Sequence, residues 1–107
     1  MAGELFAEKS DLLVPGRNLL AGLYEGQEAM FEFYEKAREL SGGTFKTYLH
    51  DVVANQRHAF AIENFMASRG GRHLDCRDVT IFHVIDGKIT SGTRLLGDPY
   101  LLDEFWS

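Results

Sequence analysis

The pattern of hydrophobic and polar positions predicts one long helix in this chain. Between residues 27 and 41, apolar side chains recur at steps of three and four, and most of the positions between them are charged. The apolar set consists of Met30, Phe33, Tyr34, Ala37 and Leu40. This spacing is typical of an amphipathic helix of about four turns. We expect Gly42 and Gly43 to end it, because glycine readily enters the left-handed conformation that closes many helices.

Beyond residue 43 the sequence has the character of β-strands. Segments rich in β-branched and aromatic residues alternate with turn residues. The predicted strands cover residues 44–54, 57–67, 73–85 and 88–96. Asp86-Gly87 is the strongest hairpin signal, because a two-residue turn of this kind needs positive φ at both positions. The pattern therefore predicts four consecutive antiparallel strands, and long strands of this kind curl because of their right-handed twist.

The two ends of the chain carry weaker signals. We expect a short helical turn at residues 5–9, a brief strand at residues 11–14 that Pro15-Gly16 stops, and an extended segment at residues 18–24. Asp98 is the expected N-cap, and Pro99 the first residue, of a final aromatic turn. The fold class is α+β, with one main helix on one face of a curved antiparallel sheet in a single domain over residues 1–107.

Composition narrows the range of partners. The net charge is −5, from 16 acidic and 11 basic residues, so we expect no nucleic-acid partner and no membrane partner. Cys76 is the only cysteine, and the four histidines are scattered along the chain without zinc-ligand spacing. No apolar run approaches the roughly 18 residues of a membrane span, and the acidic N-terminal segment does not resemble a signal peptide. We expect a cytoplasmic protein that uses neither a metal nor a cofactor.

The strand predicted at residues 57–67 is apolar on both faces. One face carries Phe60, Ile62 and Met66, and the other carries Ala59, Ala61, Phe65 and Ala67. A sheet with a helix on one side only should not show this pattern unless a second surface covers its other side. We therefore expect a homo-oligomer, a dimer or a tetramer, that forms through the outer face of the sheet.

Several short segments, in order along the chain, resemble those of one protein family. They are Leu13-Val14-Pro15-Gly16, Tyr24-Glu25-Gly26, Gly43-Thr44-Phe45, Leu49-His50-Asp51-Val52, Phe82-His83-Val84-Ile85-Asp86-Gly87-Lys88-Ile89 and Asp103-Glu104-Phe105-Trp106. Their order and spacing are similar to those of the SnoaL-like, ketosteroid-isomerase-related branch of the nuclear-transport-factor-like superfamily. The resemblance implies a cystatin-like curved sheet that wraps around the helix and leaves a ligand-sized hollow between them.

The resemblance also identifies differences from the ketosteroid isomerases. Members of the superfamily usually begin with a further long helix across the mouth of the cone. We expect that helix, with its catalytic tyrosine, to be absent here. The position of the isomerase general base is occupied by Val14, and that of the protonated aspartate by Thr80. We therefore do not expect the isomerase mechanism in this protein.

On the family's frame, alternate strand residues turn toward the hollow. The expected pocket residues are Tyr34, Ala61, Phe65, Thr80, Phe82 and Leu96. Glu63, Asp78 and Arg94 are expected to converge as two carboxylates with a guanidinium between them, able to position water or to orient a polar ligand. The alternative interpretation is a solvated salt bridge at the rim of the sheet.

Three functions remain open. The first is a protein that binds a small, partly hydrophobic molecule without transforming it. The second is an enzyme of the cyclase, dehydratase or hydrolase type that uses Glu63, Asp78 and Arg94. The third is an oligomerisation module without a ligand. We expect structural roles for His50 and His58, a surface or interface position for His83, and an inert thiol at Cys76.

Overall fold

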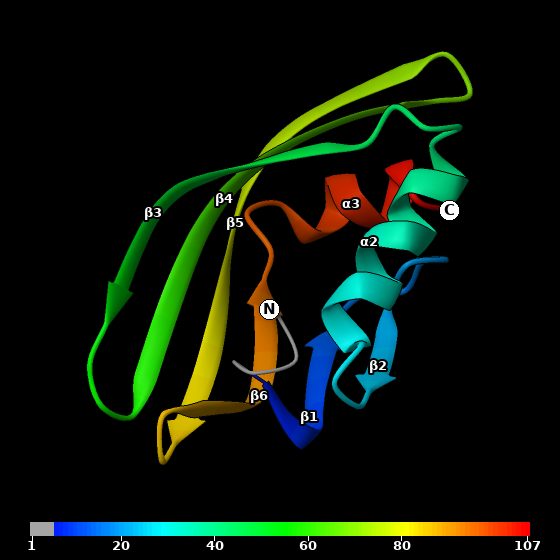
Figure 1. The fold of residues 1–107 in the computed structure, drawn as a ribbon. Coiled ribbons are helices and arrows are strands. Elements are labelled where there is room, and N and C mark those ends of the chain that lie inside the picture. Colours follow the sequence, from blue (N-terminus) through cyan, green and yellow to red (C-terminus); the bar gives the residue numbers. More distant parts are fainter. Residues whose placement is uncertain (1–5) are drawn as a thin grey trace.

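The computed structural model describes residues 6–107 as a six-stranded sheet with two helices on its inner side (Figure 1). The strand order across the sheet is β2-β1-β6-β5-β4-β3. The elements are β1 (Phe6–Val14), β2 (Gly22–Glu25), α2 (Ala29–Leu40), β3 (Lys46–Ala54), β4 (His58–Arg69), β5 (Arg72–Ile85), β6 (Lys88–Leu95) and α3 (Pro99–Phe105). Strands β3 to β5 bend around the helices (Figure 1), so the predicted α+β fold with a curved sheet is confirmed.

The sheet is mixed, whereas the sequence predicted only antiparallel pairs. Strands β3 to β6 do form consecutive antiparallel pairs, but β1 runs parallel to β6 and antiparallel to β2. The helical turn expected at residues 5–9 is wrong, because Phe6 to Lys9 belong to β1, while Leu5 lies outside the described residues. Pairing with β6, which is distant in sequence, makes this segment a strand despite its local helix propensity.

Between β1 and β2, the extended segment expected at residues 18–24 is correct only in part. Residues 22–24 belong to β2, but the chain turns at Asn18. The Asn18 side-chain oxygen accepts hydrogen bonds from the backbone N–H groups of Leu20 and Ala21, at 2.9 and 3.0 Å. Asparagine favours such local bonds, and they produce a turn in place of an extended strand.

The local signals of the sequence otherwise appear where they were predicted. Gly42 and Gly43, which follow α2, have φ values of 65° and 88°. In the β5–β6 hairpin, Asp86 and Gly87 have φ values of 51° and 77°, as a two-residue turn with positive φ requires. The Asp98 side chain caps α3 by accepting a hydrogen bond from the Leu101 N–H at 3.1 Å.

The core lies between the inner face of the sheet and the two helices. It contains Leu12, Phe33, Phe65, Leu74 and Trp106, each at most 4% exposed. Most of the aromatic side chains are therefore packing residues, as their helical and strand spacing indicated. Within residues 6–107, neither helix has the length and apolar character needed to cross a membrane.

Candidate functional site

Three neighbouring strands bring two carboxylates and a guanidinium together on the inner face of the sheet. Glu63 on β4 lies opposite Asp78 on β5, and Arg94 on β6 lies opposite Thr80, two residues beyond Asp78. Residues directly opposite each other in an antiparallel pair share a face of the sheet. The alternation of the three strands therefore places these side chains on one face, as the sequence predicted.

The Arg94 guanidinium lies between the two carboxylates. Its Nη2 is 3.3 Å from Asp78 Oδ2, and its Nη1 is 3.7 Å from Glu63 Oε1. The exposed fractions of Arg94, Asp78 and Glu63 are 2%, 2% and 6%. The alternative of a solvated salt bridge at the sheet rim is therefore wrong, because the helices and the chain after β6 cover this part of the inner face. We call Glu63, Asp78 and Arg94 the buried ionic centre.

Further groups complete the hydrogen bonding of the buried ionic centre. The hydroxyls of Tyr34 on α2 and Thr47 on β3 both donate to Glu63 Oε2, each at 2.8 Å. The Gly97 backbone N–H donates to Asp78 Oδ1 at 3.0 Å. Among the described residues, no buried side-chain nitrogen or oxygen lacks a hydrogen-bond partner. A fully satisfied network of this kind holds its members in fixed positions.

Burial changes the acidity of two groups beside this centre. Desolvation, followed by the charge of Glu63, raises the pKa of the Tyr34 phenol well above its usual value, so the phenol stays protonated and donates to Glu63. Desolvation, followed by the charge of Asp78, raises the pKa of the Cys76 thiol to about 11. The inert thiol expected from the sequence agrees with this shift, because the reactive species is the thiolate.

A small cavity adjoins Asp78 and Arg94. Its volume is about 20 Å³, and its walls are otherwise mainly apolar side chains, including the predicted pocket residues Phe65 and Leu96. A volume of this size holds about one water molecule. This cavity is therefore far smaller than the ligand-sized hollow that the family resemblance implies.

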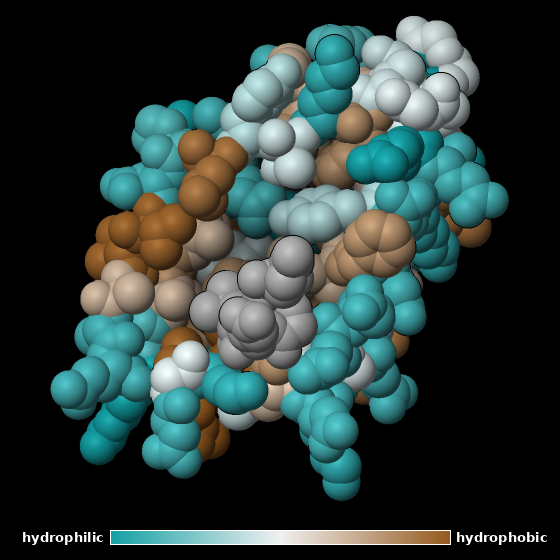
Figure 2. Space-filling view, in the orientation of Figure 1, coloured by the Kyte–Doolittle hydropathy of each residue, from teal (hydrophilic) through white to brown (hydrophobic). Residues whose placement is uncertain are grey.

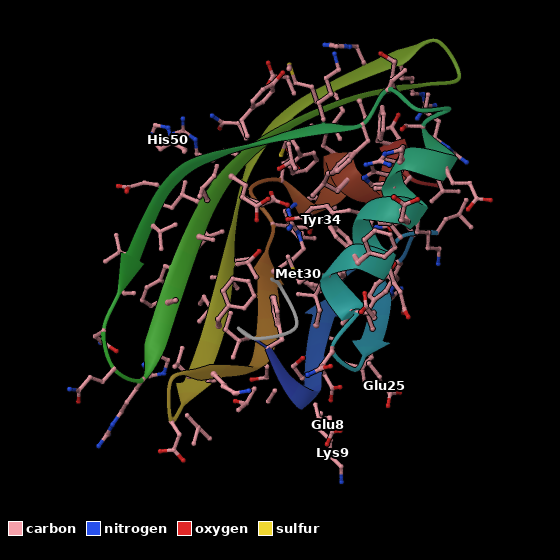
Figure 3. The ribbon with its side chains drawn as sticks, viewed as in Figure 1. Glu8, Lys9, Glu25, Met30, Tyr34 and His50 are labelled. Carbon is pink, nitrogen blue, oxygen red and sulfur yellow. The ribbon has the colours of Figure 1, made fainter. Side chains whose placement is uncertain are left out.

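A larger open groove runs between α2 and the beginning of β3. Its volume is about 470 Å³, within the range of small-molecule sites. Its lining consists of Phe31, Tyr34, Glu35, Arg38, Phe45, Lys46, Thr47 and Tyr48. Tyr34, and Met30 one turn before it, lie on the side of α2 that faces the sheet (Figure 3). Of these lining residues the sequence predicted Tyr34 alone, because the others acquire their place only when β3 packs beside α2.

The remaining predicted pocket residues lie on the inner face but do not line this groove. Ala61 on β4 is half-buried and lies between Thr80 on β5 and Val52 on β3. Thr80 is fully buried and accepts a hydrogen bond from Arg94 at 3.3 Å. Phe82 is 8% exposed and packs edge to face against Phe6. The inner face is thus apolar on both sides of the buried ionic centre.

Two apolar side chains of this face stay exposed to solvent. Leu49 and Val52 on β3 lie opposite Glu63 and Ala61, so they share the inner face, and they are 64% and 49% exposed. Hydrophobic surface gathers along the β3 side of the molecule (Figure 2). Within residues 6–107, no group of three or more histidine, cysteine, aspartate or glutamate side chains is arranged to hold a metal ion.

Comparison with known proteins gives consistent matches. The family described as the SnoaL-like domain matches residues 1–92. An uncharacterized protein of Mycobacterium tuberculosis is 30% identical over 97% of this chain and 80% of its own length. Bal32a, from a soil-derived mobile gene cassette, is 34% identical with a TM-score of 0.85, over 97% of this chain and 80% of its own. A Xanthomonas campestris protein of unknown function with a cystatin-like fold is 24% identical, with a TM-score of 0.80, over 98% of this chain and 82% of its own.

Proposed function

Since this chain belongs to the SnoaL-like domain family, we propose that it binds a small, partly hydrophobic molecule on the inner face of its sheet without transforming it. The observation that carries this proposal is the exposure of Leu49 and Val52 on the face that also holds the core. Soluble proteins seldom leave a contiguous apolar surface uncovered unless it binds something. A ligand that covers these side chains would gain the hydrophobic free energy of their burial.

The groove between α2 and β3 gives the ligand its expected character. Aromatic walls from Phe31, Phe45 and Tyr48 favour a planar, apolar ring. The hydroxyls of Tyr34 and Thr47 form the polar part of the wall, and both are held in place by Glu63. We propose that a polar substituent of the ligand meets these hydroxyls, while its apolar body extends toward Ala61 and Phe82.

Two adjacent residues of β3 provide a matched test of this proposal. Val52 faces inward and Val53, opposite Phe60, faces outward, with exposed fractions of 49% and 55%. A library of planar, partly hydrophobic compounds is screened by thermal shift, and the affinity of each hit is measured for Val52→Asp and Val53→Asp. We expect Val52→Asp to weaken binding at least tenfold and Val53→Asp to leave it unchanged. The absence of any hit, or equal losses in both variants, would refute the proposal.

The buried ionic centre favours a second candidate function, an enzyme of the cyclase, dehydratase or hydrolase type. A guanidinium between two carboxylates, beside a cavity of about 20 Å³, is able to orient one water molecule or one polar group. In this alternative Glu63 and Asp78 act as acid and base, and Arg94 orients them. Mass spectrometry of each hit after incubation with the protein distinguishes the two functions. Conversion that Asp78→Asn and Glu63→Gln abolish identifies an enzyme, and unchanged compound identifies a binding protein.

The outer face of the sheet supports self-association as part of the same proposal. Val53, Phe60 and Leu95 on this face are 55%, 37% and 48% exposed. Two copies that pack these faces together would remove this apolar surface from water, as in an oligomer with two-fold symmetry. A reducing, cytoplasmic location also belongs to the proposal, since Cys76 has no partner for an intrachain disulfide. Cell fractionation tests this location.

A further inference from the structure

Two histidines that are far apart in sequence meet on the outer face of the sheet. His58 begins β4, His83 lies near the end of β5, and the register places them directly opposite each other. Their ring centroids are 5.0 Å apart, with an angle of 62° between the ring planes. The sequence predicted no metal site because its histidines are scattered. Strand pairing brings these two together, and their spacing along the chain does not reveal this proximity.

The geometry points to a metal-binding site: we propose that His58 and His83 together bind a borderline-soft divalent cation such as Zn²⁺. A zinc ion about 2.1 Å from one nitrogen of each ring, at a tetrahedral angle, sets the two ring centroids roughly 5 Å apart. The observed separation of 5.0 Å matches this value. The rings stand edge to face, so the pair has the spacing of a shared ion, and rotation about the side-chain bonds would turn one nitrogen of each ring toward it.

The surroundings of the pair are suited to a metal ligand. The Nδ1 atom of His83 is 3.1 Å from the Ser91 hydroxyl, which fixes the ring and leaves Nε2 for a cation. Both histidines line an open surface hollow together with Arg57 and Asp86, whose opposite charges offset each other. In the single chain His83 is exposed and His58 is half-buried, and turn residues line their hollow, so a hydrated cation can reach both from the end of the sheet. The pair supplies two ligands, and water completes the coordination.

Titration of the tag-free protein with ZnCl₂ by isothermal calorimetry tests this site. We expect one Zn²⁺ per chain, bound through the two imidazoles together. His58→Gln and His83→Gln should each weaken binding at least tenfold. His50→Gln and His73→Gln are the matched controls, since each removes one exposed histidine elsewhere on the surface.

A second measurement keeps the test valid if a variant is less stable. Zn²⁺ that joins β4 to β5 stabilises the folded chain, so it should raise the melting temperature of the wild type and of both control variants. It should leave the melting temperatures of His58→Gln and His83→Gln unchanged. Equal zinc affinity in all four variants, or a rise in melting temperature that persists without His58 or His83, would overturn the proposal.

Discussion

At the scale of single residues, the site depends on Arg94. Its guanidinium lies between two carboxylates, and it is also 4.8 Å from the centroid of the Phe33 ring. Each buried charge costs several kcal/mol of desolvation, which its ionic and hydrogen-bonding partners must offset. Removal of Arg94 would leave Asp78 and Glu63 as two buried carboxylates without a counterion.

Replacement of Arg94 by methionine should therefore destabilise the protein severely. We expect Arg94→Met to lower the free energy of unfolding by about 3–5 kcal/mol, measured by urea denaturation. Arg72→Met is the matched control, because Arg72 pairs with Glu104 at the surface, where both side chains are more than half exposed. An exposed pair contributes only about 0–1 kcal/mol. Equal losses in the two variants would show that the buried ionic centre contributes no more to the free energy of unfolding than the surface pair does.

Cys76 provides a test of pH dependence beside the same centre. Its pKa is raised to about 11 in the folded chain from an ordinary value of 9.0. The folded state therefore holds the thiol proton more tightly, and this contribution to stability is present below pH 9 and lost as the pH rises toward 11.

We expect alkylation of the folded protein by iodoacetamide to be slow at neutral pH and to accelerate with a midpoint near pH 11. The urea-unfolded chain serves as the control and should show an ordinary thiol midpoint. A folded-state midpoint at or below the unfolded value would contradict the burial of this group beside Asp78.

The sequence predicted only part of the candidate site at this scale. The convergence of Glu63, Asp78 and Arg94 was predictable because strand alternation fixes which face each side chain occupies. The bonds from Tyr34 and Thr47 to Glu63 were not, because the first depends on how α2 packs against the sheet and the second on how β3 pairs with β4. A register shift between Leu49 and Asp51 sets that pairing, and no residue pattern signals it.

At the scale of elements, the sequence predicted the elements that depend on neighbouring residues, but it did not predict pairing between strands that are distant along the chain. Helix α2, the hairpin at Asp86-Gly87 and the cap at Asp98 each depend on a few neighbouring residues. Strand β1 depends on β6, about 80 positions further along the chain, so its first residues were predicted as a helical turn. Their short-range pattern contains no information about that partner.

The β5–β6 hairpin offers a prediction at this scale. Gly87 has a φ of 77°, a conformation that β-branched residues adopt with strain. We expect Gly87→Val to lower the free energy of unfolding by about 1–2 kcal/mol in urea denaturation. Gly87→Asn is the control and should cost less, because asparagine tolerates positive φ. If both variants retain wild-type stability, the turn conformation is not what selects glycine here.

At the scale of the whole molecule, the sheet presents apolar surface on both of its faces. Every residue of the edge strand β3 is exposed, and inward and outward apolar side chains alternate along it. We propose that a ligand covers the inner face and that a second copy of the chain covers the outer face. The two assignments can be tested separately, because Val52 and Val53 belong to opposite faces.

Self-association is the prediction that follows for the outer face. We expect the wild type to sediment as a dimer or a tetramer in analytical ultracentrifugation. Val53→Asp should weaken the assembly at least tenfold, because a carboxylate would be buried in an apolar interface. Val52→Asp should leave the assembly intact. A wild type that stays monomeric at high concentration would refute the assignment of the outer face.

NMR mapping of a bound ligand tests most directly whether the inner face of the sheet is the binding site. A hit from the thermal-shift screen is titrated into isotope-labelled protein, and chemical-shift changes are followed residue by residue. We expect the largest changes at Tyr34, Thr47, Leu49 and Val52, around the groove and the inner face. Changes confined to Val53, Phe60 and Leu95 on the outer face would contradict this expectation.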